Sequence, residues 1–188
     1  MLIALHKPYD VLSQFTAEVA GQRTLSEFGL PSRVYPVGRL DRDSEGLLLL
    51  TDEPRLVKSL LDPGREIAKT YVVQVEGEPS AAQLAHLSTG VEIRVKKRTF
   101  ATAPATVALI PDPGFAERQP PVRFRKTVPD AWLRLSITEG KNRQVRRMCA
   151  AVGLPVLRLV RVAVGDHRLG GLRPGAWREI GGEPVAGR

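Results

Sequence analysis

Short stretches in which apolar and polar residues alternate predict most of the strands of this chain. Residues 132–138, WLRLSIT, alternate strictly, which is typical of a strand with one buried face. Residues 69–76, KTYVVQVE, are rich in β-branched side chains and predict a second strand. The four leucines at 47–50 form a run too short for a helix and predict a buried strand. Further strands are expected at 1–6, 34–37, 154–164 and 176–180, and an antiparallel pair is expected from 91–102 with 105–110.

Apolar side chains spaced three and four residues apart predict a helix over residues 142–152. Its apolar face is formed by Val145, Met148, Cys149 and Val152. Asp52 is expected to cap a second helix over residues 53–61, with Pro54 in the first turn, where its missing N–H does no harm. Another helix is expected at 79–87 and a single helical turn at 24–28.

This order of elements predicts an α+β fold with a mixed, largely antiparallel sheet and flanking helices. Residues 111–129 contain five prolines and no apolar period, which indicates a long loop, expected to be mobile in the free protein. The sequence contains no internal repeat and no linker. We therefore expect a single domain over residues 1–188.

Composition and charge narrow the possible partners. Lys and Arg number 28 against 20 acidic residues, so the formal net charge is +8, and a basic surplus of this size favours a polyanion such as nucleic acid. A solvated basic face is the alternative. Cys149 is the only cysteine, so an intramolecular disulfide is excluded. The sequence has neither a signal peptide nor the run of about 20 apolar residues that a membrane span needs, and we expect a cytoplasmic protein without membrane contact.

A dense charge cluster precedes the four leucines, in the segment GRLDRDSEGLLLLTD from Gly38 to Asp52. Its alternating acids, Asp41, Asp43 and Glu45, match the start of a calcium loop, but the prolines before them argue against the helix such a loop requires. A surface turn with mutually paired charges is a second interpretation. A third is a nucleophile, because a carboxylate at the edge of a buried strand is partly desolvated and needs a fixed cation.

A second cluster, TEGKNRQVRRM at residues 138–148, places three cations where the predicted helix begins. Arg143, Arg146 and Arg147 lie at the positive end of the helix dipole, so an anion is expected close by. Phosphate and the Asp41 carboxylate are both candidates, and a solvated polar face is the alternative. Tyr71 lies in the predicted strand at 69–76, where it is either an ordinary strand residue or a ring that stacks on a base.

Three segments together resemble the RsuA-like family of pseudouridine synthases. GRLDRDSEGLLLLTD resembles the family signature GRLDxxTxGLLLLTND, although Ser44 replaces a Thr and one Asn is absent after Thr51. KTYVV resembles the Lys-x-Tyr strand, and EGKNRQVRRM resembles the third motif. The resemblance covers nearly the whole chain. By this resemblance we expect the chain to begin directly at the catalytic domain, without the small N-terminal RNA-binding domain that many members carry.

The resemblance implies a role for each motif residue. Asp41 would be the nucleophile that converts uridine to pseudouridine. Tyr71 would pack against the uracil, Arg146 would pair with Asp41, and Arg39 would fill the space left by a flipped base or hold a phosphate. No metal and no cofactor are implied.

The implied partner is large-subunit ribosomal RNA or its precursor, and we expect a monomer. The expected phosphate-binding residues are Lys141, Arg143, Arg147, Arg158 and Arg161, with the basic run at 94–98. The proline-rich loop would close over RNA through Arg118, Arg123, Arg125 and Lys126. Three alternatives stay open: the same chemistry on small-subunit ribosomal RNA or transfer RNA, a non-catalytic assembly factor that binds ribosomal RNA, and a hydrolase that releases uracil.

Overall fold

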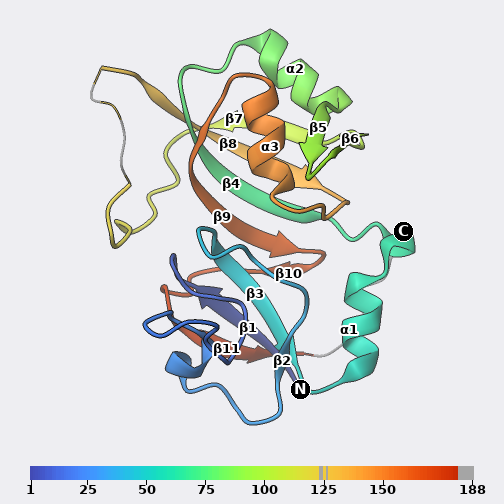
Figure 1. Ribbon diagram of the computed structural model, residues 1–188, viewed down its shortest axis with the longest axis vertical. Coiled ribbons are helices and arrows are strands. Elements are labelled where there is room, and N and C mark those ends of the chain that lie inside the picture. Colours follow the sequence, from blue (N-terminus) through green and yellow to red (C-terminus); the bar gives the residue numbers. More distant parts are fainter. Residues whose placement is uncertain (123–124, 126, 182–188) are drawn as a thin grey trace. The chain divides into compact units, whose positions relative to one another are not determined.

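The computed structural model describes residues 1–122, 125 and 127–181. The chain forms two compact units (Figure 1). The first joins Met1–Ile67 to the segment that starts at Val160, and the second is Ala68–Leu159. The single domain expected over residues 1–188 stays a prediction.

The first unit is built mainly from strands. Its strands are β1 (Leu2–Lys7), β2 (Tyr35–Pro36), β3 (Glu45–Thr51), the later part of β9 (Val156–Val164), β10 (His167–Arg168) and β11 (Trp177–Ile180). Its helices are α1 (Pro54–Leu61) and two 3₁₀ turns, η1 (Leu25–Phe28) and η2 (Pro63–Arg65).

Strand β3 is the centre of this unit. It pairs antiparallel with β1 along one edge, while its other edge takes β9 in parallel at the start and β2 antiparallel at the end. All seven residues of β3 are buried, as expected for a strand covered on both faces. Leu47, Leu48, Leu49 and Leu50 are each at most 1 % exposed, and a fully buried leucine contributes about 1.5–3 kcal/mol. The residues that precede β3 therefore continue from a firmly anchored strand.

The helix after β3 has a different cap from the one predicted. Glu53, and not Asp52, is the N-cap of α1, and its side chain makes no capping hydrogen bond. The Asp52 carboxylate instead accepts a hydrogen bond from the N-terminal ammonium of Met1 at 2.8 Å. That charged donor competes with the neutral N–H groups that a cap would satisfy. The helical turn expected at 24–28 is confirmed as η1, with Thr24 and Glu27 forming a capping box.

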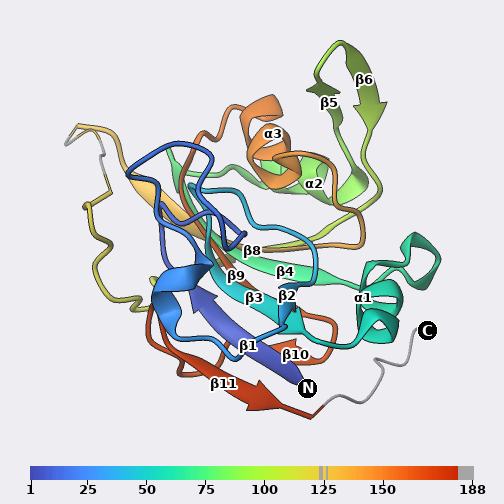
Figure 2. The ribbon, with the colours of Figure 1, turned by 60° about the horizontal axis from the view of Figure 1, so that its bottom comes forward.

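The second unit combines strands with two helices. Its elements are β4 (Lys69–Glu76), α2 (Ala81–Thr89), β5 (Glu92–Val95), β6 (Arg98–Ala101), β7 (Thr106–Ile110), β8 (Asp130–Ile137) and α3 (Gln144–Ala151). Strand β8 pairs antiparallel with β4 on one side and with β7 on the other. Helices α2 and α3 lie together over one face of these strands (Figure 2).

The antiparallel pair predicted from 91–102 with 105–110 is wrong. Residues 92–101 form a hairpin of their own, in which Val95 pairs with Arg98 across a two-residue turn, while β7 joins β8. Alternation shows that a stretch is a strand but does not reveal its partner.

The two helices of this unit begin later than the sequence pattern indicates. Helix α2 starts after Ser80, which forms a capping box with Gln83. Helix α3 starts at Gln144, because Arg143 adopts a left-handed conformation with φ of 52° and is its N-cap. The long loop is confirmed where it is described, since residues 111–122, 125 and 127–129 contain no helix or strand. Arg123 and Lys126, expected to contact RNA, lie outside the described residues.

The α+β class and the largely antiparallel sheet are confirmed. The pairs β1–β11, β1–β3, β2–β3, β4–β8 and β7–β8 are antiparallel, and β3–β9 is parallel. In the described part of the chain, no helix has both the length and the apolar character needed to cross a membrane.

Candidate active site

Asp41 lies in the turn that leads into β3, within the first unit. Its side chain is half-buried. The Asp41 carbonyl accepts a hydrogen bond of 3.0 Å from the N–H of Ser44, which closes the turn directly before the strand. The buried leucine strand therefore fixes one end of the segment that carries this carboxylate.

The residue before Asp41 is held by a buried hydroxyl. Ser13 is 4 % exposed, and its Oγ donates to the Leu40 carbonyl at 2.8 Å while accepting from the Leu40 N–H at 3.0 Å. One side chain thus satisfies both backbone groups of Leu40. Because an unsatisfied buried backbone group costs about 1–3 kcal/mol, these two bonds hold the backbone on the N-terminal side of Asp41.

The residue after Asp41 is held from the loop that follows β1. The Arg42 carbonyl accepts from the N–H of Asp10 at 2.8 Å and from the Lys7 Nζ at 3.4 Å. The Arg42 Nε also pairs with the Asp10 carboxylate at 2.6 Å. That exposed ion pair contributes little by itself, but it adds to the two bonds on the carbonyl. Asp41 is therefore fixed through the backbone on both sides.

Lys7 is a charged residue in the core beneath this turn. Its side chain is 0 % exposed, and its Nζ also donates to the carbonyls of Pro8 at 2.9 Å and Val11 at 2.8 Å. Burial lowers the pKa of Lys7 from 10.5 to about 7, although the negative charges of Glu45, Asp43 and Asp41 act in the opposite direction. The ammonium thus lies within the field of all three carboxylates of the charge cluster.

Two further charged residues are buried where β3 and β9 run side by side. Glu45 pairs with Val160 and Gly46 with Arg161 in the parallel register, and Arg161 donates from its Nε to the Leu47 carbonyl at 2.8 Å. Gly46 has a φ of 101°, and a Cβ there would lie 2.3 Å from the Arg161 carbonyl oxygen. Only glycine allows this close approach of the two strands.

Arg39 is exposed two residues before Asp41. Its guanidinium makes no hydrogen bond or ion pair with the residues that the structure describes. Arg39 is thus available for an anion from solution, as the predicted contact with a phosphate requires.

Tyr71 and Arg146 belong to the second unit. Tyr71 lies in β4 opposite Leu135 of β8 and is 9 % exposed. Its hydroxyl makes no hydrogen bond within the described part of the chain. Arg146 lies in the first turn of α3, half-buried, and its Nη1 donates to the Val156 carbonyl at 3.4 Å. The pairing of Arg146 with Asp41 joins residues of different units and stays a prediction.

The loop before α3 is organised by a carboxylate that the sequence interpretation missed. Glu139 accepts hydrogen bonds from the Gln144 side chain at 2.6 Å, the Lys141 ammonium at 2.6 Å and the Ala103 N–H at 3.1 Å. Burial acts to raise the pKa of Glu139, but these three donors outweigh it and lower the pKa. The signal was present in EGKNRQVRRM, where Glu139 and the buried Gln144 flank Lys141 and Arg143.

The residues expected to bind phosphate have partners within their own unit. Lys141 pairs with Glu139 and lies 5.6 Å from the centroid of the Phe100 ring. Arg147 donates to the carbonyls of Arg94 at 2.5 Å and Asn142 at 3.1 Å.

Arg158 is 6 % exposed, donates to the Ala116 carbonyl at 3.0 Å and lies over the Phe115 ring. Arg143 is the half-buried N-cap of α3. These contacts give three of the four cations, Lys141, Arg147 and Arg158, a part in holding the unit together. Phosphate binding by the four stays a prediction.

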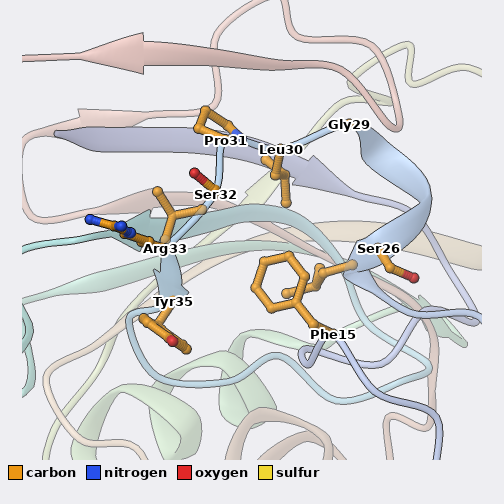
Figure 3. A pocket seen from close by; sticks show the side chains of 10 residues that line it. Phe15, Ser26, Gly29, Leu30, Pro31, Ser32, Arg33 and Tyr35 are labelled. Carbon is orange, nitrogen blue, oxygen red and sulfur yellow. The ribbon is translucent and has the colours of Figure 1, made fainter.

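A hollow of about 380 Å³ lies elsewhere in the first unit, around Phe15, Leu30, Arg33 and Tyr35 (Figure 3). None of the catalytic or RNA-binding residues predicted from the sequence lines this hollow.

Among the described residues, no three His, Cys, Asp or Glu side chains are arranged to hold a metal ion.

Comparison with known proteins gives consistent matches. The family model described as RNA pseudouridylate synthase matches residues 1–151. Ribosomal large subunit pseudouridine synthase E of Xanthomonas campestris pv. campestris is 57 % identical over 180 residues, which is 95 % of this chain and 94 % of the relative. The protein of the same name from Vibrio vulnificus is 51 % identical over 95 % of this chain and 74 % of its own. A crystal structure of a pseudouridylate synthase covers 98 % of this chain and 73 % of its own, with a TM-score of 0.79 and 26 % identity.

Proposed function

This chain belongs to the RNA pseudouridylate synthase family, and we propose that it isomerises a specific uridine in large-subunit ribosomal RNA with Asp41 as the nucleophile. The large-subunit substrate is supported by the names of relatives that are 57 % and 51 % identical over nearly the whole chain. The bond between N1 and C1′ breaks, the uracil turns, and a bond forms between C5 and C1′. The C5 proton is lost and N1 gains one, so the atoms balance without a co-reactant.

The observation that carries the proposal is the double anchoring of Asp41. Ser13 fixes Leu40, and Lys7 together with Asp10 fixes the Arg42 carbonyl. Nucleophilic attack, on either the uracil ring or C1′, needs a carboxylate placed to within a fraction of an ångström. A mere surface turn has no use for four hydrogen bonds, two of them buried, on the residues next to one aspartate.

Three further residues receive roles in the same reaction. Tyr71 packs against the uracil and assists removal of the C5 proton. Arg146 pairs with the Asp41 carboxylate, for which a guanidinium is suited because it stays charged and binds in a bidentate manner. Arg39 occupies the space that the base leaves or holds a phosphate, since the target nucleotide must leave the stack before its atoms can react.

The proposal that the protein binds RNA rests on its positive charge. The formal net charge of +8 favours RNA. Lys141, Arg143, Arg147 and Arg158 contribute to the phosphate-binding surface in addition to their contacts within the second unit. We propose that the protein acts in the cytoplasm as a monomer, because one chain supplies Asp41, Tyr71 and Arg146.

The test is a map of pseudouridines in ribosomal RNA from cells with and without the protein. One uridine of the large subunit should lose its modification when the protein is absent, and the wild-type gene should restore it. A gene with Asp41→Asn should not. An unchanged large-subunit map would contradict the substrate assignment. Restoration by Asp41→Asn would contradict the role of Asp41 and favour an assembly factor. Release of free uracil from the RNA would favour a hydrolase.

A further inference from the structure

The β5–β6 hairpin of the second unit carries an unusual concentration of positive charge. Arg94, Lys96, Lys97 and Arg98 are all exposed within five residues. The hairpin forms a two-stranded sheet of its own. Figure 2 shows it extending away from α2 and α3, which belong to the same unit.

These four cations have no side-chain partner in the part of the chain that the structure describes. None of their side chains makes a hydrogen bond or ion pair with the residues that the structure describes. They differ in this from Lys141, Arg147 and Arg158, whose cationic groups bind a carboxylate or carbonyl groups of the same unit. Four neighbouring cations repel one another, and a polyanion that displaces its counterions relieves this repulsion.

The turn of the hairpin places a lysine in an unfavourable backbone conformation. Lys96 has a φ of 55°, in the left-handed region that favours glycine or asparagine. A lysine in that conformation is strained, and such strain concentrates at functional sites.

The base of the hairpin is fixed. Ile93 is 2 % exposed, and the hydroxyl of Thr102 accepts from the Val91 N–H at 3.0 Å. Arg147 of α3 donates to the Arg94 carbonyl, so the hairpin is tied to the helix that carries Arg146. A basic surface held at one orientation can place RNA in register.

We propose that the β5–β6 hairpin binds the phosphate backbone of the substrate RNA, outside the nucleotide that reacts. The proposal rests on the proposed function and adds a substrate-binding element to it. RNA is favoured over an acidic protein because the exposed side chains of the hairpin are charged or small. Protein interfaces have cores of aromatic and large apolar residues, whereas the hairpin's residues of this kind, Ile93, Val95 and Phe100, are buried or half-buried.

The test compares two variants that lose the same charge. Lys96→Gln, Lys97→Gln and Arg98→Gln together remove three hairpin cations. The control combines Arg55→Gln, Lys58→Gln and Arg173→Gln, three exposed cations of the first unit. The probe is large-subunit ribosomal RNA from cells that lack the protein. Affinity is measured against salt concentration, and pseudouridine formation gives kcat and KM.

The hairpin variant should bind at least about tenfold more weakly at low salt, with the slope of log affinity against log salt reduced by about 2. Its kcat at saturating RNA should stay near the wild-type value, while KM rises. Affinity and slope equal to wild type, a loss no greater than in the control, or a loss confined to kcat would each overturn the proposal. If wild type binds this RNA but forms no pseudouridine, the proposed function fails, whereas the slopes still test the hairpin.

A single substitution separates binding from folding. Lys96→Gly removes one cation and also the left-handed strain, so thermal stability should rise while RNA affinity falls. A rise in stability with unchanged affinity would exclude Lys96 from the RNA contact and count against the hairpin as an RNA-binding element.

Discussion

Ser13 acts on Asp41 through the backbone of Leu40, so removal of its hydroxyl should affect both stability and catalysis. Ser13→Ala leaves a buried N–H and a buried carbonyl without their partner, which should lower the free energy of unfolding by about 1–3 kcal/mol. It should also lower kcat, because the nucleophile is less firmly placed. Urea unfolding and initial rates measure the two effects. Ser32→Ala, at an exposed position, is the control. Wild-type kcat in Ser13→Ala would separate this hydroxyl from catalysis.

Lys7 should make stability depend on pH. In the unfolded chain it is protonated up to about 10.5, whereas in the folded protein its pKa is about 7. Between these values the unfolded state binds more protons, so stability rises with pH from about 7 to about 10.5. The N-terminal ammonium acts in the opposite direction, because the carboxylates of Asp52 and Glu53 raise its pKa to about 10.

Comparison with Lys7→Met isolates the lysine. The difference in unfolding free energy between wild type and Lys7→Met should grow in favour of wild type from pH 7 to pH 10, as measured by urea unfolding. The terminal amine is present in both proteins, so its contribution cancels. A difference that stays constant with pH would mean that Lys7 keeps its ordinary pKa.

The residues of the proposed site differ in how readily the sequence predicts them. Asp41, Tyr71 and Arg146 were predicted because each lies in a motif that resembles one of the family's motifs. Lys7 and Ser13 escaped notice because they bond to carbonyl and amide groups about 30 residues away along the chain. No local pattern records such a contact. Only the fold brings β1 and its following loop against the turn that carries Asp41.

At the scale of the elements, the pairing of β3 with β9 depends on Gly46. Gly46→Ala places a Cβ 2.3 Å from the Arg161 carbonyl oxygen, so either β9 moves or the pair opens. The expected loss is about 3 kcal/mol or more from crowding and backbone strain together. Gly21→Ala is the matched control, since Gly21 also has a positive φ of 81° but nothing within 4 Å.

Gly21→Ala should cost only about 1–2 kcal/mol, the strain of the left-handed conformation alone. Chemical denaturation of both variants measures the difference. Equal losses would show that the approach of β9 to β3 is not as close as the structure gives it.

The elements were largely predictable, but their pairing and exact ends were not. The sequence located β4 at 69–76 to the residue, because four of its eight side chains, Thr70, Val72, Val73 and Val75, are β-branched. The partner of β7 was missed, since the turn at Lys96 and Lys97 lets β5 and β6 pair with each other. Helix α3 begins at Gln144 because the backbone of Arg143 is in the left-handed conformation. An arginine in the sequence does not predict that conformation.

At the scale of the whole molecule, the proposed chemistry needs residues that are far apart in the sequence and belong to both units. Arg146→Met should lower kcat by at least about 100-fold, since it removes a charge partner from a reacting carboxylate, while RNA affinity changes by less than about tenfold. Initial rates and binding measure the two. Arg173→Met, at an exposed position of the first unit, is the control. Equal losses in rate and affinity would make Arg146 a phosphate contact.

Release of the C5 hydrogen tests the central claim about Asp41 most directly. With large-subunit ribosomal RNA tritiated at C5 of uridine, wild type should release tritium as pseudouridine forms. Asp41→Asn should release none above background, a loss of at least about 10³-fold, and should bind the RNA as tightly as wild type. Asp43→Asn, two residues further along, should keep most of the activity. Tritium release by Asp41→Asn at a rate near that of wild type would contradict the account.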